Sequence, residues 1–308
     1  MEEKNSRIAE IKEKYKEWFM FDKDIITITN ILDLEILKKS LFEEKIEGAK
    51  MRTAGWELIA YPFLPGDKFA LVFENKHMPK KNYYSSEYRI MIIDLNSDIN
   101  NSIVAGVTLV NEAICTIVGK DEKLFYVLCD YNNEYELLSL VCEDDNPKRI
   151  PIGNNVTRVI TKENGNIVVG YSCGIGEDII REYSPDGEIV SSVKNKAALH
   201  CTDITTDIHG LVWYHLFPFN KIVCLDNNFT IKTDAAGFDG FFFCKNGDAL
   251  VTSFSKEDEQ YLYIMEKQEN EFVNPKLIMR ESDSLGISTQ TDWITTYKDE
   301  LLFIGYVK

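Results

Sequence analysis

The sequence lacks the motifs of several large classes of protein. It has no Walker A loop, no G-x-G-x-x-G loop opening a helix and no H-E-x-x-H pair, so we predict no nucleotide or other organic cofactor. No stretch approaches the roughly 18 uninterrupted apolar residues of a membrane span. The charged N-terminus also has no apolar core of a secretory signal. We therefore expect a cytoplasmic protein without a membrane partner.

The seven cysteines include no CxxC pair, and most of them lie inside apolar runs. A free cysteine is often buried and behaves as a small hydrophobic residue. We interpret these cysteines as reduced residues of the core rather than as a disulfide framework.

Basic residues are scarce, since 34 Lys and Arg stand against 50 Asp and Glu and the formal net charge is −16. The average surface of such a chain repels DNA and RNA, so no nucleic-acid partner is expected. The same field attracts a basic protein partner or a cation. The alternative is that the acidity only keeps the protein soluble.

The first 54 residues are predicted to form a helical segment ahead of the main domain. Apolar residues at helical spacing between positions 7 and 19 indicate an amphipathic helix. A second helical period runs from Asp33 to Glu44, with Asp33 as the N-cap. Between the two, Asp24–Asn30 is β-branched and extended.

From residue 55 to 308 the chain consists of short strands separated by turns, and a turn followed by an apolar strand recurs six times. Successive copies begin 38 to 55 residues apart, which is typical of a β-propeller built from four-stranded sheets. We therefore predict an all-β protein, a six-bladed β-propeller with a short N-terminal α-helical segment. The apolar strands of the six copies begin at Phe69, Leu124, Ile167, Leu211, Ala249 and Leu301.

The last copy is predicted to stop after its second strand, at Lys308. An open ring would leave strand edges that invite aggregation. The extended segment Asp24–Asn30 is the obvious donor of a missing strand. We predict that the N-terminal end of the chain closes the ring.

The fourth copy contains the motif Asp207-Ile208-His209-Gly210-Leu211-Val212-Trp213, in which Gly210 is free to adopt the positive φ of a turn. This motif resembles the blades of NHL, gluconolactonase-like and two-component-sensor propellers, and the resemblance covers residues 55 to 308. It implies the architecture but no particular activity, because the fold carries hydrolases, isomerases, sensors and scaffolds. In gluconolactonase-like proteins a metal-binding Asn precedes the position of Asp203. Thr202 stands there in this chain, which weakens the lactonase interpretation.

The first strand of each blade lines the central channel of a propeller, so charged residues on it are candidates for binding. In the third, fourth and sixth copies a charged residue stands seven positions before the turn glycine or its equivalent. In the fifth copy the charged residue stands one position earlier. A charged ring could hold a divalent cation such as calcium or a small polar ligand. The alternative is a channel in which Arg and Asp neutralise each other. The channel candidates are Arg158, Asp203, Asp239 and Asp292, with His200 and His215 nearby, and any metal would be held by Asp203, Asp239 and Asp292.

A second candidate site is the loop of residues 75–87, the main cluster of basic and aromatic residues in this acidic chain. Tyrosine is enriched at protein interfaces, so the loop is a candidate partner-binding segment, with an ordinary exposed loop as the alternative. Its candidate residues are His77, Lys80, Lys81, Tyr83 and Tyr84.

The stretch Gly170-Tyr171-Ser172-Cys173-Gly174 matches the G-x-S-x-G pattern of a nucleophile elbow. That motif functions where a strand is followed directly by a helix. Here it is predicted to end a strand that leads into another strand. We do not expect Ser172 to be a catalytic nucleophile.

Because no catalytic set is assembled, the predicted function is non-catalytic binding of a protein or ligand through one face of the ring. One version is an inhibitor or immunity-type protein whose negative charge complements a basic partner. The alternative is a metal-dependent hydrolase or lactonase with a divalent cation in the central channel.

Overall fold

The computed structural model describes most of the chain between Glu10 and Val307. Strands account for the great majority of these residues, and no helix among them is long and apolar enough to cross a membrane. The described residues are 10–11, 13–14, 26–34, 37, 56–65, 68–77, 85–94, 103–121, 123–130, 132–140, 147–175, 178–194, 200–207, 209–217, 221–233, 238–244, 246–254, 260–281, 287–290, 293–298 and 301–307.

The N-terminal helices stay a prediction. Helical backbone is found at the four described residues between Glu10 and Lys14, and at Leu34 and Leu37. The remainder of both predicted helices lies outside the described residues. Asp33, the predicted N-cap of the second helix, ends β1 and directly precedes the helical residue Leu34, a position compatible with an N-cap.

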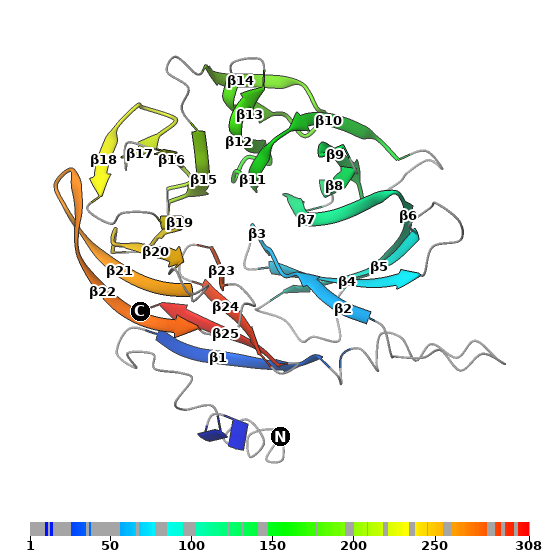
Figure 1. Ribbon diagram of the computed structural model, residues 1–308, viewed down its shortest axis with the longest axis horizontal. Helices are drawn as coiled ribbons and strands as arrows, with labels where there is room; N and C mark the ends of the chain where they lie inside the picture. The colour runs from blue at the N-terminus through cyan, green and yellow to red at the C-terminus, as the bar shows by residue number, and fades with distance from the viewer. Residues whose placement is uncertain are drawn as a thin grey trace.

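The strands form antiparallel modules of four, each built mostly from consecutive strands (Figure 1). The first module also carries a short extra strand, β3 (Phe63–Leu64), paired with β4. The first three modules contain β2 (Trp56–Ala60), β4 (Lys68–His77), β5 (Ser85–Asp94) and β6 (Ile103–Val110); β7 (Glu112–Lys120), β8 (Lys123–Asp130), β9 (Glu134–Ser139) and β10 (Arg149–Asn154); and β11 (Val156–Thr161), β12 (Ile167–Ile175), β13 (Asp178–Tyr183) and β14 (Ile189–Lys194).

The next two modules are joined at their outer edges into one eight-stranded sheet, because β18 and β22 pair in parallel over two residues of each strand. They contain β15 (His200–Thr206), β16 (Val212–Phe217), β17 (Lys221–Cys224) and β18 (Thr230–Thr233); and β19 (Phe238–Phe243), β20 (Ala249–Phe254), β21 (Gln260–Gln268) and β22 (Glu271–Glu281).

The module that remains combines the two ends of the chain. Its strands are β23 (Ile287–Gln290), β24 (Trp293–Lys298), β25 (Leu301–Val307) and β1 (Ile26–Asp33), in the order β1-β25-β24-β23. The N-terminal segment Asp24–Asn30 thus falls largely in β1, which pairs antiparallel with β25. The expectation that the C-terminal end supplies only two strands was wrong. It supplies three, because the repeat count in this module was displaced by one strand.

The modules are arranged radially around a common centre (Figure 1). Strands β7, β11, β15, β19 and β23 lie near this centre, and β14, β18, β22 and β1 lie at the periphery. The inner strands contact one another in sequence, β2 with β7, β7 with β11, β11 with β15 and β15 with β19, while β23 contacts β3.

The second strand of each module explains the long apolar runs of the sequence. Successive side chains of a strand point to opposite faces, and in this protein both faces of the sheet are covered by a neighbouring module. In β4, Phe69, Leu71 and Phe73 pack toward β1 and β25, whereas Ala70 and Val72 pack toward the module β7–β10. In β8, Tyr126 faces the preceding module and Val127 the following one.

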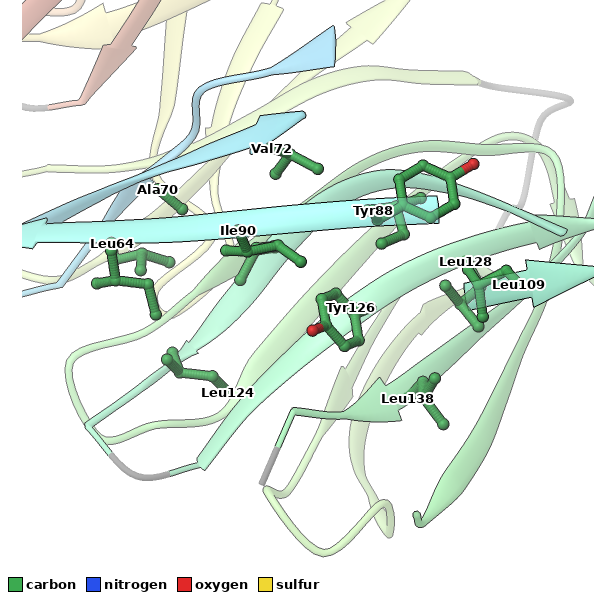
Figure 2. Packing of buried hydrophobic residues seen from close by; sticks show 13 residues of the cluster. Leu64, Ala70, Val72, Tyr88, Ile90, Leu109, Leu124, Tyr126, Leu128 and Leu138 are labelled. Carbon is green, nitrogen blue, oxygen red and sulfur yellow. The ribbon is translucent and has the colours of Figure 1, made fainter. Parts of the chain in front are cut away.

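Apolar clusters therefore fill the spaces between neighbouring modules. Figure 2 shows the cluster between the first two, where Val72, Ile90 and Tyr126 lie among side chains from both sheets. Each buried Leu, Ile or Phe side chain contributes about 1.5–3 kcal/mol. Burial of this kind on both faces holds neighbouring modules against one another.

The Asp-x-x-Gly-x-x-Trp motif is a self-contained turn. The Oδ1 atom of Asp207 accepts hydrogen bonds from the backbone N–H groups of His209 (2.9 Å) and Leu211 (3.0 Å). Its Oδ2 atom accepts one from the indole N–H of Trp213 at 2.9 Å. Gly210 has a φ of 73°, the left-handed conformation expected of it. The motif thus fixes the turn between β15 and β16 and orients a core tryptophan.

Candidate functional site

Five of the innermost strands share one irregularity. In each, the pairing with the next strand skips one residue, which leaves a β-bulge. In three modules this residue lies eight positions before the turn glycine, at Gly165, Gly210 or Gly247. Bulges re-aim side chains and are frequent next to binding sites. The bulged residues are Ile59, Cys115, Thr157, Thr202 and Asp239.

A cavity of about 500 Å³ lies beside these strands. Its walls come from β2 and β3 of the first module, β7, β8 and β9 of the second, β11 of the third and β15 of the fourth. Three of the bulged residues, Ile59, Cys115 and Thr157, contribute to the wall. Much of the wall thus comes from inner strands, and Arg158 is the one predicted channel residue among the described residues that line it.

Arg158 and Asp203 form an ion pair between two neighbouring inner strands. The Nη1 atom of Arg158 lies 3.1 Å from Oδ1 of Asp203. The Oδ2 atom of Asp203 accepts a hydrogen bond from the backbone N–H of Phe241 on β19 at 3.0 Å. The guanidinium also lies over the ring of Phe242, with its carbon 5.4 Å from the ring centroid. One charge pair thus ties β11, β15 and β19 together.

The two partners differ in their exposure to solvent. The side chain of Asp203 is 1% exposed and does not reach the cavity wall, whereas that of Arg158 is 34% exposed and lines it. Burial raises the pKa of the Asp203 carboxyl, and the charge of Arg158 and the N–H of Phe241 oppose this shift. This pair is of the kind expected under the alternative to a ligand-binding charged ring, in which Arg and Asp neutralise each other.

His215 lies behind this wall rather than in the cavity. It belongs to β16, is 2% exposed and shares a hydrogen bond between Nδ1 and the hydroxyl of Thr202. Desolvation lowers the pKa of its imidazole to about 4. The imidazole is therefore neutral at physiological pH.

The free energy of unfolding is expected to fall by roughly 3 kcal/mol between pH 6.5 and pH 4 because of His215. In this window the unfolded chain binds a proton at the imidazole while the folded chain, with its pKa at about 4, does not. Stability therefore decreases as the pH falls. Urea denaturation at several pH values measures the slope, and the His215→Gln variant should lose this component. An unchanged slope in the variant would show that His215 titrates normally in the folded protein.

Cys115 stands at a bulge and opens into the cavity, where the surrounding walls still desolvate its thiol. Desolvation raises the pKa of Cys115 to about 12, and its neighbour Cys129 acts in the same direction. Desolvation and contact with Cys129 likewise raise the pKa of Tyr135 to about 12. Cys115 and Tyr135 are hence neutral hydrogen-bonding groups of the cavity wall. Cys201, Cys224 and Cys244 are buried, as expected of core cysteines.

The other predicted channel residues are described only in part. Asp239 is the bulged residue of β19, and its side chain is not among those described. Asp292 lies outside the described residues, between β23 and β24 in the sequence. His200 begins β15 and its ring lies 6.4 Å from that of Phe217. The calcium site on Asp203, Asp239 and Asp292 stays a prediction.

The predicted partner-binding loop is shorter than expected. Strand β4 continues to His77 and β5 begins at Ser85, and these two residues pair across the hairpin. Both ends of the predicted loop are therefore strand. Lys80, Lys81, Tyr83 and Tyr84 lie outside the described residues, so their role stays a prediction.

Ser172 lies inside β12 (Ile167–Ile175), and its N–H donates a hydrogen bond to the carbonyl of Asn155 at 2.9 Å. A strand continues on both sides of it. This is not the sharp strand-to-helix turn of a nucleophile elbow.

Sequence reasoning missed most of the cavity wall. Counting seven residues back assumes a regular strand, whereas each bulge adds a residue. In β11 both Thr157 and Arg158 line the cavity, and in β15 neither Thr202 nor Asp203 does. The polar residues that the count passed over are Cys115, Thr116, Tyr135, Thr157, Thr205 and Thr206. Apart from Tyr135, which lies on β9, they are small polar residues of the innermost strands, and many ordinary strands contain such residues too.

Comparison with known proteins gives a fold and no family. No protein-family model matches the chain, and no curated protein matches it. Among solved structures, the selenomethionine-substituted virginiamycin B lyase from Staphylococcus aureus is similar over 92% of this chain and 100% of that chain, with 10% sequence identity and a TM-score of 0.50. Together with the radial arrangement of four-stranded sheets, this similarity decides the fold. The chain is a β-propeller.

Other solved structures are similar to this propeller at lower scores. The Pan2 WD40 domain of Neurospora crassa is 7% identical and covers 93% of this chain and 97% of that chain, with a TM-score of 0.47. The PQQ-bound aldose sugar dehydrogenase from Streptomyces coelicolor is 11% identical and covers 82% and 97%, with a TM-score of 0.46. At these identities the similarity concerns the propeller fold and not the chemistry of any site.

Proposed function

We propose that this propeller is a closed ring of six modules that acts as a non-catalytic binding module and holds its ligand in the central cavity. The observation that carries the proposal is the cavity itself. Its volume of about 500 Å³ falls within the range of small-molecule sites, roughly 300–1,000 Å³. Its wall combines apolar side chains with a few hydroxyl groups and one arginine, which is the usual composition of such sites.

The chemistry of the wall supports binding rather than catalysis. A thiol acts as a nucleophile in its thiolate form, and the pKa of about 12 keeps Cys115 protonated near neutral pH. His215, the nearest described histidine with a perturbed pKa, is buried in β16 and does not line the cavity. No described side chain of the wall therefore combines a nucleophile with a general base.

The geometry of Asp203 gives little support to the hydrolase alternative. Its carboxylate is already occupied by Arg158 and by the N–H of Phe241, and the described residues include no group of three side chains suited to a metal ion. The acidic net charge of −16 supports a basic protein partner at the outer surface. A basic partner is compatible with a ligand in the cavity.

Filling the cavity is expected to abolish ligand binding. Cys115→Trp places a large side chain at an exposed bulge of the wall, and Ile189→Trp makes the same kind of change on β14, where Ile189 is 57% exposed and outside the cavity. A library of small fragments is screened against wild type and both variants by ligand-observed NMR. We expect hits that bind wild type and Ile189→Trp but not Cys115→Trp. Hits that bind all three proteins equally, or no hits at all, would contradict the proposal.

A further inference from the structure

The charge of the cavity is opposite to that of the protein. The chain has 50 acidic residues, yet none of the described residues that line the cavity is Asp or Glu. Arg158 is the single charged residue among them. In a low-dielectric concavity one cation has a larger effect than the same charge on the open surface.

Arg158 is held in a fixed position, and its guanidinium has more N–H donors than its contact with Asp203 uses. Its Nη1 atom pairs with the buried Asp203, and the face of its guanidinium lies over Phe242. A guanidinium carries five N–H donors in a planar fork. Within the described part of the chain, these two contacts are the ones that Arg158 makes. The remaining donors are available on the side that lines the cavity.

The other residues of the wall indicate the chemistry of the rest of the ligand. Ile59, Ile117, Val118 and Val127 provide apolar surface, and Thr116 and Thr157 provide hydroxyl groups. Because Asp203 lies behind Arg158 and offsets its charge, the site suits a group with a single negative charge better than a dianion.

We propose that the cavity binds a small molecule with an apolar body and one carboxylate, and that Arg158 receives the carboxylate. This inference rests on the proposed function and deepens it by naming the class of ligand. The planar fork of an arginine matches a carboxylate in a bidentate arrangement. Asp203 and Phe242 act as positioning residues, because they fix the guanidinium without touching the ligand.

Benzoate, benzamide and inorganic phosphate are suitable probes, titrated separately and followed by ligand-observed NMR. Benzoate and benzamide have nearly the same shape and differ in charge. Wild type is expected to bind benzoate about tenfold to a hundredfold more tightly than benzamide, which is the usual advantage of a charge-assisted hydrogen bond. Phosphate is expected to bind more weakly than benzoate.

The decisive variant replaces both members of the pair, Arg158→Gln with Asp203→Asn, so that no buried charge is left alone. Its preference for benzoate over benzamide should drop to about onefold, while benzamide still binds. Arg149→Gln is the matched control, because Arg149 pairs with Glu112 and Glu136 away from the cavity. The control should keep the wild-type preference.

Several results would overturn the inference: no binding of benzoate to wild type, equal binding of benzoate and benzamide, tighter binding of phosphate, or a preference that survives in the double variant. The Cys115→Trp variant shows whether such a result contradicts only carboxylate recognition or also the proposed ligand-binding cavity. Equal binding of both probes that is lost in Cys115→Trp leaves a ligand-binding cavity without carboxylate recognition. Binding that persists in Cys115→Trp places the probes outside the cavity and contradicts both.

Discussion

A chain that lacks residues 1–37 is expected to lose its cooperative unfolding transition. The deletion removes β1, leaves the edge of β25 unpaired and strips the buried Leu32, Leu34 and Leu37 from their cluster. Three buried leucines represent roughly 5–9 kcal/mol, which is comparable with the whole free energy of unfolding of a typical domain. Urea denaturation followed by tryptophan fluorescence and circular dichroism measures the loss.

A synthetic peptide provides the control for this deletion. A peptide of residues 24–37, added to the truncated protein, is expected to restore a cooperative transition in a concentration-dependent way. The same peptide with Leu32→Lys should restore much less, because Leu32 is buried opposite Leu302. If the truncated protein unfolds as wild type does, β1 does not close the ring.

Replacing Asp203 by alanine is expected to cost about 3–5 kcal/mol, the usual effect of removing one partner of a buried ion pair. The substitution leaves the Arg158 guanidinium without its counter-ion and the N–H of Phe241 without its acceptor. The free energies of unfolding of the variant and of wild type, each from urea denaturation at pH 7, give the difference.

Two further variants separate the contributions of charge and of hydrogen bonding to the loss in free energy of unfolding. Asp203→Asn keeps an acceptor near the N–H of Phe241 and should be less destabilising than Asp203→Ala. Arg158→Gln combined with Asp203→Asn removes both charges and is expected to cost less than Asp203→Ala alone. A cost below about 1 kcal/mol for Asp203→Ala would mean that the pair is solvated like a surface ion pair.

The turns and the second strands could be predicted from sequence because their signals are local. Gly165, Gly210 and Gly247 have the positive φ that a tight turn requires. The run from Phe69 to Phe73 is apolar throughout because neighbouring modules cover both faces of β4. A strand can be predicted from such a pattern without knowing which distant residues it contacts.

The register of the inner strands could not be predicted in the same way. A bulge adds one residue without any distinctive residue type, so a count from the turn cannot tell which residues line the cavity. Thr157 and Arg158 both do, whereas Thr202 and Asp203 do not. In the last module the repeat was counted from β25, although the strand that corresponds to β4 is β24. The choice of Asp292 as a channel residue depended on that displaced count, and Asp292 lies outside the described residues.

The orientation of the Asp203 side chain could not be predicted from the sequence either. An aspartate on an inner strand is expected at the channel, but this carboxylate is buried at 1% exposure because Arg158 and the N–H of Phe241 satisfy it there. Both partners come from other modules, 45 and 38 residues away in the sequence. Only their arrangement in space shows that Arg158, and not Asp203, faces the cavity.

Hydrogen exchange of the full-length protein tests most directly whether the N-terminal strand belongs to the ring. Amides of β1 that bond to β25, within the paired residues Asn30 to Asp33 and Leu301 to Ile304, are the ones to follow. Our account predicts that amides of both strands are protected to a similar degree and lose protection together in mild urea. Exchange of the β1 amides at the rate of an unfolded chain, while β25 stays protected, would contradict it.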